Sequence, residues 1–345
     1  MRRTFTAVHA ALPLLAALLA ASCNQAESPS APEESAPQAL GADSASSDTV
    51  ATADSLGTAA LIGSGIPYGP YGLYANVTEF EWGPKPFTGS VDNTFAGSII
   101  QRINAARQQR HRLLMAMTGG NAREYLTNGK FDLAKWKARM NTFNTAAIKK
   151  AVADGVADGT IVGNKIIDEP ETPKWGGVFT KPMIDGMAKY VKNMFPTLPV
   201  GVGQGAPGFR WRSFEHYKVV DWVSSQYQWS FNSGGITSWR DQVLSWARAE
   251  GVTPAFGLNI MDGGVNDRTG AWDCPGTGGK GTIAGRCRMT ADQVRTWGKA
   301  IGPAGCAMTM WRYDDVFMSK SANVSAFQDV ASLLNSKPRR SCKRP

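Results

Sequence analysis

Histidine is scarce in this chain of 345 residues, and several common catalytic motifs are absent from it. Only His111 and His216 lie beyond the N-terminal leader, far apart and without the spacing of zinc ligands. The sequence has no Gly-x-Ser-x-Gly turn and no phosphate-binding P-loop, and no Gly-x-Gly-x-x-Gly turn follows the first predicted strand. These absences argue against zinc enzymes, serine hydrolases of the nucleophile-elbow type and P-loop nucleotide enzymes. We expect neither a metal ion nor a cofactor.

Long apolar runs are also lacking, and the longest is in the leader. Residues 1–22 contain two arginines, an apolar run over 12–19 that is too short to span a bilayer, and three small residues before Cys23. This order is typical of a signal peptide. Small residues before a cysteine resemble a bacterial lipoprotein signal, although Ala20 stands where leucine is usual. The resemblance implies lipidation of Cys23 and a bacterial envelope protein, anchored to a membrane on the outer-membrane, periplasmic or extracellular side; an ordinary cleaved leader is the alternative.

Residues 24–60 contain no aromatic residue, lysine or arginine and consist mostly of Ala, Ser, Pro, Glu and Asp. Such a segment cannot bury enough apolar surface to offset the entropy of ordering, so 23–60 is predicted to be a disordered tether. The rest of the chain, with 35 basic and 22 acidic residues, has a net charge of +13. Its Lys and Arg residues are scattered, apart from a basic tail at 338–345, which favours a solvated surface over a nucleic-acid site. An anionic polysaccharide remains the alternative partner.

The five cysteines become four once Cys23 is lipidated. Export permits disulfides. Cys274 and Cys287 bracket a glycine-rich loop, and Cys306 and Cys342 would join the last strand region to the tail. We therefore predict these two pairs.

Strand-like and helix-like segments alternate through residues 61–337, which predicts an α/β domain. Seven strand–helix units are recognisable, and a (β/α)₈ TIM barrel needs eight over about 250 residues. We expect the missing strand between Gln204 and Tyr217. A doubly wound open sheet is the alternative fold, and the missing glycine-rich turn argues against it.

The strand predicted at 161–167 is short, β-branched and followed by Asp168, Glu169, Pro170 and Glu171. Pro170 cannot donate to a sheet ladder and is expected to keep Glu169 extended. A buried strand that ends in a carboxylate is how parallel barrels present catalytic acids. A solvated turn is the simpler interpretation.

Polar and aromatic residues also follow the other predicted strands, and parallel strands bring their carboxyl ends to one face. Carboxylates and amides can bind sugar hydroxyls, and aromatic rings can stack on sugar C–H faces, although about half of such aromatics are expected to be core residues. The predicted carbohydrate-binding residues are Asp168, Glu171, Trp175, Gln226, Gln228, Asn259, Trp311, Tyr313 and Asp315.

The sequence Asp168-Glu169-Pro170 resembles the strand-end Asn-Glu-Pro or Asp-Glu-Pro of TIM-barrel glycoside hydrolases. The resemblance implies that Glu169 is the general acid/base, with a second carboxylate from a late strand: Asp314 first, then Asp315 and Asp262. It departs from the family in two ways, because Asp168 replaces the commoner Asn and the motif falls on the third predicted strand instead of the fourth. A hidden early strand would restore the register. The alternative function is a non-catalytic glycan-binding or structural envelope lipoprotein.

Overall fold

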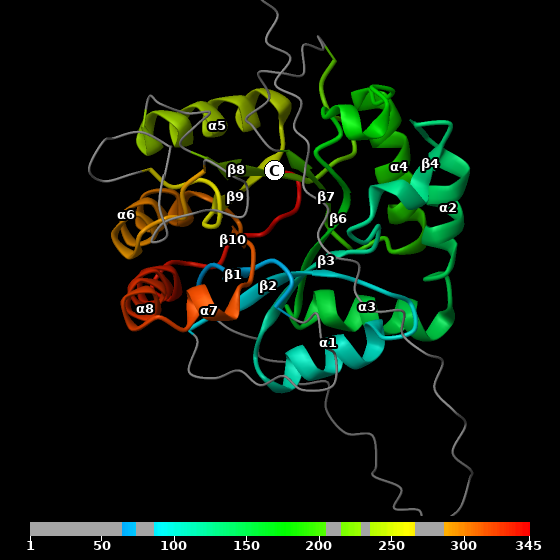
Figure 1. Ribbon diagram of the computed structural model, residues 1–345. Helices are drawn as coiled ribbons and strands as arrows, with labels where there is room; N and C mark the ends of the chain where they lie inside the picture. Colours follow the sequence, from blue (N-terminus) through cyan, green and yellow to red (C-terminus); the bar gives the residue numbers. More distant parts are fainter. Residues whose placement is uncertain (1–63, 74–85, 205–214, 229–234, 266–285) are drawn as a thin grey trace, which may run out of the picture. The chain divides into compact units, whose positions relative to one another are not determined.

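The computed structural model describes residues 64–73, 86–204, 215–228, 235–265 and 286–345, all within the unit Ala51–Pro345 (Figure 1). The predicted signal peptide, Cys23 and the tether lie outside these ranges. Among the described helices, none is long and apolar enough to cross a bilayer.

Eight parallel strands form a nearly closed (β/α)₈ barrel, as predicted. Along the sheet their order is β1, β10, β9, β8, β7, β6, β3 and β2. Strands β1 and β2 approach each other through Thr88 N–H to Tyr68 O (2.9 Å) and Gly72 N–H to Val91 O (3.0 Å). The strands are β1 (Tyr68–Pro70), β2 (Gly89–Asn93), β3 (Arg112–Ala116), β6 (Ile161–Asp168), β7 (Val200–Gln204), β8 (Trp222–Tyr227), β9 (Thr253–Asn259) and β10 (Met308–Trp311).

The strand that the sequence prediction lacked is β2, near the start of the barrel. Its predicted position between Gln204 and Tyr217 was therefore wrong. Most of that segment lies outside the described residues. Strand β2 was missed because its sequence, Gly-Ser-Val-Asp-Asn, is short and polar. Its polar side chains are satisfied internally, with the Ser90 hydroxyl donating to Asp92 at 2.8 Å. With β2 counted, the strand that ends in Asp168 is the fourth of the barrel in chain order, as expected if an early strand was hidden.

Helices surround the barrel (Figure 1). Several of them begin at a capping side chain: Asp132 accepts from two backbone amides of α2, and Thr290 forms a capping box with Gln293 at the start of α6. A small hairpin, β4 (Leu126–Thr127) with β5 (Lys130–Phe131), precedes α2. The helices are α1 (Ile99–Gln108), α2 (Leu133–Asn141), α3 (Ala146–Ala157), α4 (Lys181–Met194), α5 (Ile236–Glu250), α6 (Ala291–Ile301), α7 (Asp315–Met318) and α8 (Ser321–Asn335).

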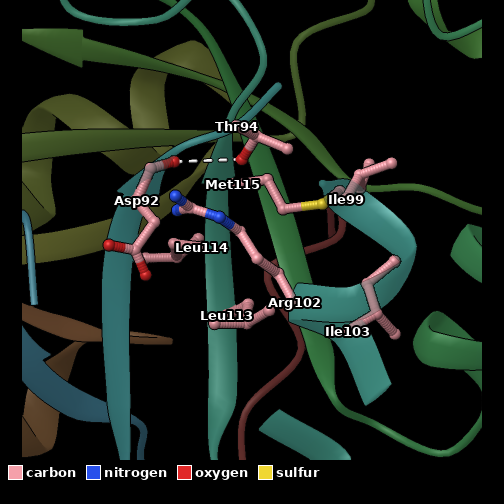
Figure 2. Close-up of a pocket in the computed structure, with 8 residues that line it drawn as sticks. All are labelled: Asp92, Thr94, Ile99, Arg102, Ile103, Leu113, Leu114 and Met115. Atoms are coloured by element: carbon pink, nitrogen blue, oxygen red, sulfur yellow. Dashed lines mark hydrogen bonds between the residues drawn. The ribbon is translucent and has the colours of Figure 1, made fainter. Parts of the chain in front are cut away.

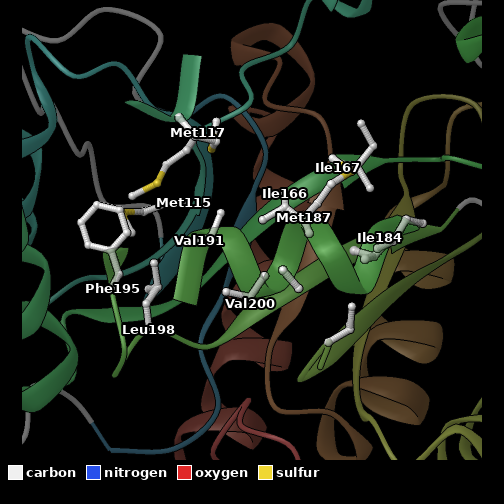
Figure 3. Packing of buried hydrophobic residues seen from close by; sticks show 14 of the residues in the cluster. Met115, Met117, Ile166, Ile167, Ile184, Met187, Val191, Phe195, Leu198 and Val200 are labelled. Carbon is white, nitrogen blue, oxygen red and sulfur yellow. The ribbon is translucent and has the colours of Figure 1, made fainter. Parts of the chain in front are cut away.

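The core has a layer between strands and helices and a smaller layer inside the barrel. In the outer layer, Ile166 and Ile167 of β6 belong to one buried cluster with α4 (Figure 3). Inside, Trp222 packs beside Gly163 and Gly201, where an added Cβ would lie 2.7 Å and 2.0 Å from the indole. These two positions therefore need glycine for the indole to fit.

The basic tail is bound to the barrel instead of being a free charged surface. Cys306 and Cys342 form the predicted disulfide. The Arg344 guanidinium donates to the carbonyl oxygens of Val220, Tyr217 and Glu250 at 3.0, 2.7 and 3.0 Å. Since these partners come just before β8 and β9, the tail covers the end of the barrel where the strands begin.

Cys287 is also disulfide-bonded. Its predicted partner, Cys274, lies outside the described residues, so that pairing stays a prediction.

Candidate active site

Asp168 and Glu169 lie at the carboxyl end of β6, but their backbone differs from the expectation. Strand β6 ends at Asp168, and Glu169 has a φ of +46°, in the left-handed region rather than the predicted extended one. The Glu169 amide still donates to Gly203 O at 2.7 Å, which ties the turn to β7. A left-handed conformation in a non-glycine residue costs about 1–3 kcal/mol and is commonest at functional sites.

Two lysines that the sequence interpretation missed pair with these carboxylates. Lys165 Nζ lies 2.7 Å from Asp168 Oδ1, while Lys174 Nζ lies 3.0 Å from Glu169 Oε2 and 3.7 Å from Asp168 Oδ2. We call Lys165, Asp168, Glu169 and Lys174 the acid–lysine cluster. In a regular strand, residues three apart point to opposite faces, but the pairing of β6 with β7 shifts register between Lys165 and Ile167. This irregularity brings Lys165 and Asp168 together.

The lysines determine the charge of Asp168. Burial would raise the pKa of its carboxyl, but the charges of Lys165 and Lys174 outweigh burial and lower that pKa to about 2. The pKa of the Lys165 ammonium is raised because the attraction of Asp168 and Tyr71 exceeds the opposing effect of burial. In the same way, burial lowers the pKa of Lys174, and the two carboxylates raise it by more. At neutral pH Asp168 is therefore ionised and can only accept hydrogen bonds.

Aromatic side chains connect this cluster to the last strand. Lys165 Nζ lies 4.5 Å from the centroid of the Tyr71 ring and 3.4 Å from its hydroxyl oxygen. The Tyr71 ring in turn packs edge-on against Trp311, with centroids 5.7 Å apart. Trp311 is 37% exposed, which is unusual for so large a side chain. The structure thus connects two predicted residues, Asp168 and Trp311, through Lys165 and Tyr71, while a third, Glu169, joins Asp168 through Lys174.

A sequence signal for Lys165 did exist. It is the only charged residue within 161–167, a run that is otherwise apolar apart from Asn164. A lone lysine inside a buried strand needs a charged partner, and Asp168 is the nearest acid in sequence.

Asp314, the leading candidate for the second carboxylate, caps a helix in this structure. It is the N-cap of α7, where its Oδ1 accepts from the Phe317 amide at 2.7 Å. Nearby, the Tyr313 hydroxyl donates to Asp315 at 2.9 Å. Both aspartates follow β10, as expected, while the pairing of Asp314 with Glu169 stays a prediction.

The remaining predicted residues lie at or just after the carboxyl ends of β8, β9 and β6. Asn259 and Asp262 are both buried, and the Asn259 side-chain oxygen accepts from the Asp262 amide at 2.9 Å, so Asn259 shapes the turn after β9. Gln226, Gln228 and Glu171 are half-buried. Their contacts with a sugar stay a prediction.

Trp175 is buried, and not exposed to a ligand as the sequence interpretation expected. Its side chain is 3% exposed, and its ring packs against Phe131 and Phe179. Its indole N–H donates to the carbonyl oxygen of Asp168 at 2.8 Å. Trp175 therefore anchors the strand end instead of offering its face to a sugar.

No group of three or more His, Cys, Asp or Glu side chains suited to a metal ion occurs in the part of the chain that the structure describes. A cavity of about 10 Å³ lies between α1 and the strands β2 and β3, where Arg102 reaches toward Asp92 and Thr94 (Figure 2). This volume holds at most one water molecule, so the cavity is a packing feature and not a ligand site.

The sequence matches no protein-family model and no curated protein. Solved structures with a similar fold include glycoside hydrolases. A GH113 β-1,4-mannanase in complex aligns with a TM-score of 0.50 at 9% identity, covering 79% of this chain and 99% of the mannanase. The endo-β-1,4-mannanase of Thermotoga petrophila aligns at 0.48 and 11% identity, covering 80% and 77% of the two chains. The GH113 β-mannanase of Alicyclobacillus acidocaldarius aligns at 0.45 and 14% identity, covering 79% and 98%.

At such low identity the likeness concerns the fold alone. The comparison therefore supports the (β/α)₈ TIM-barrel fold and no more than that.

Proposed function

We propose that this protein is an envelope-anchored glycoside hydrolase in which Glu169 is the general acid/base. The observation that carries the proposal is the position of Glu169: it follows the fourth strand of a (β/α)₈ barrel, at the end where the active sites of such barrels lie. A strained backbone and an exposed aromatic ring at the end of β10 accompany it. Carbohydrate is the proposed substrate.

In this mechanism Glu169 protonates the glycosidic oxygen, and a second carboxylate acts as nucleophile or activates water. Asp314 is our first choice for that carboxylate, followed by Asp315 and Asp262. Asp168, being an acceptor only, would bind a hydroxyl or N–H of the sugar. Because Lys174 pairs with Glu169 in this structure, this ion pair has to open for the Glu169 carboxyl to hydrogen-bond the glycosidic oxygen instead.

The test is an activity panel of polysaccharides and aryl glycosides on the chain carrying Cys23→Ala, which removes the proposed lipid site. Glu169→Gln should lower activity on substrates with poor leaving groups by about 10²–10⁴-fold, with the fold unchanged in circular dichroism. Asp154→Asn is the matched control, because Asp154 is an exposed residue of α3 whose carboxylate forms a surface ion pair with Lys150. Equal activity of the Glu169→Gln variant and the control would refute the acid/base assignment.

A second candidate function is glycan binding without cleavage. It is favoured by the acid–lysine cluster, in which each carboxylate already has an ammonium partner. In that case the unmodified protein would bind glycans but release no reducing ends from any of them.

The anchoring part of the proposal depends on the leader alone. Cys23→Ala should move the protein from the membrane fraction to the soluble envelope fraction. Unchanged membrane association of that variant would exclude lipidation of Cys23 as the anchor.

A further inference from the structure

We propose that Lys174 recognises an anionic group on the bound sugar, a carboxylate or a sulfate, and that this group replaces Glu169 as the partner of the ammonium. The inference deepens the proposed function, on which it rests for the location of the site. It names the substrate class as an acidic glycan.

The two lysines of the cluster differ in how accessible they are. The Lys165 side chain is 9% exposed and is held between Asp168, at 2.7 Å, and the ring of Tyr71. The Lys174 side chain is 28% exposed, and both of its carboxylate distances are longer, 3.0 and 3.7 Å. Lys174 is therefore the ammonium that a ligand can reach, while Lys165 keeps Asp168 in place.

The backbone of Lys174 is fixed although its side chain is not buried. It belongs to the short 3₁₀ turn Pro173–Trp175, and the next residue, Trp175, is bound to the Asp168 carbonyl and packed in the core. An exchange of partners then needs only a rotation of the lysine side chain, whose flexible four-carbon stem carries a compact charge. A fixed backbone with a movable ammonium suits a ligand-recognition residue.

Charge balance links this exchange to the role of Glu169. The cluster holds two ammonium groups and two carboxylates, with the Tyr71 hydroxyl as its other titratable neighbour. A bound anion gives the Lys174 ammonium a new partner and releases Glu169 from its ion pair, which frees the carboxyl for its proposed role as general acid/base. The net charge of +13 on residues 61–345 would attract such a substrate.

The test is titration calorimetry at pH 7 and low salt with three trisaccharides: trigalacturonate, a sulfated galactose trisaccharide and mannotriose. We expect the protein to prefer the charged sugars to mannotriose, with a preference that weakens as salt is added. The relative strength of trigalacturonate and the sulfated sugar decides between carboxylate and sulfate. Binding of mannotriose as tight as that of both charged sugars would overturn the proposal, and so would no binding of any of them.

Two variants should change the affinity for charged sugars in opposite directions. Lys174→Met should weaken it about tenfold or more, because a charge-assisted hydrogen bond is lost. Glu169→Gln should strengthen it by up to about fivefold, because the competing carboxylate is gone. Lys150→Met, which removes an exposed lysine of a surface ion pair on α3, is the control and should leave binding unchanged. Thermal melting checks that each variant is folded.

Equal effects of Lys174→Met and Lys150→Met, or weaker binding by Glu169→Gln, would overturn the inference. Its failure is distinguishable from failure of the proposed function. Cleavage of neutral mannan that depends on Glu169, without a preference for charged sugars, would refute the inference alone. Selective binding of charged sugars without any cleavage would support Lys174 as the anion-binding residue and refute hydrolysis alone.

Discussion

The disulfide between Cys306 and Cys342 should make the C-terminal tail a main contributor to the stability of the barrel. Cys306 lies just before β10 and Cys342 in the tail, and both are buried. Between them the bond closes a loop with a sequence separation of 36 residues. Replacing Cys342 by alanine opens that loop and releases the tail from the end of the barrel.

The chain-entropy model gives about 4 kcal/mol for a loop of this length. The tail also contributes hydrogen bonds of its own: Arg344 donates to three carbonyl oxygens, and the Lys343 carbonyl accepts from the Thr253 hydroxyl at 2.7 Å. Arg344→Gln should lower stability by about 1–3 kcal/mol with the disulfide intact, because the three buried carbonyls lose their donor.

Urea unfolding followed by tryptophan fluorescence measures both effects. We expect the midpoint for Cys342→Ala to fall well below that of the unmodified protein, and trypsin to cut the basic tail of this variant first. Reduction of the unmodified protein should move its midpoint in the same direction. If Cys342→Ala unfolds at the same urea concentration as the unmodified protein and its tail stays resistant to trypsin, the tail does not stabilise the barrel as argued.

Three further predictions concern acid stability and Asp314. Burial, aided by the charge of Arg112, lowers the pKa of His111 from 6.5 to about 3. As the pH falls, His111 is therefore protonated in the unfolded chain before it is protonated in the folded one, so the free energy of unfolding should fall by roughly 4 kcal/mol from pH 6.5 to pH 3. In a His111→Gln variant the urea midpoint should depend less on pH. The lowered pKa of Asp168 stabilises the fold above pH 3.8, and this contribution is lost toward pH 2. Since the Asp168 side chain is 44% exposed, we expect a contribution of only about 1 kcal/mol, which should be smaller in Lys165→Met, where Lys174 alone remains. Asp314→Ala should lower stability by about 1 kcal/mol because it removes the cap of α7, whereas Asp314→Asn keeps a capping side chain. Loss of hydrolysis in Asp314→Asn, with its stability unchanged, would therefore indicate a role of the carboxylate in the reaction. Full activity of Asp314→Asn would exclude Asp314 as the second carboxylate.

The barrel could be predicted because most of its strands can be recognised from their own local sequence. Strand β6 is a β-branched run that ends in carboxylates, and helix α6 begins with a Thr290 cap whose capping box is present in the structure. Strand β2 could not be found in this way, because Ser90 and Asp92 make it look like a loop. It is a strand because the neighbouring strand β3 pairs with it along its length and because Gly72, just after β1, donates to Val91 O.

For the site, the sequence by itself determined which carboxylates come to the end of the fourth strand, since Asp168 and Glu169 directly follow a strand that the pattern identifies. It could not determine their partners. Whether Trp175 is exposed or buried depends on its packing against Phe179 and against Phe131, which lies 44 residues earlier in the chain. The pairing of Lys165 with Asp168 depends on an irregularity in the β6–β7 ladder, and Tyr71 reaches Lys165 only because the barrel brings β1 and β6 together across its interior. Local sequence thus places the acids, while the closure of the sheet decides which charges and rings surround them.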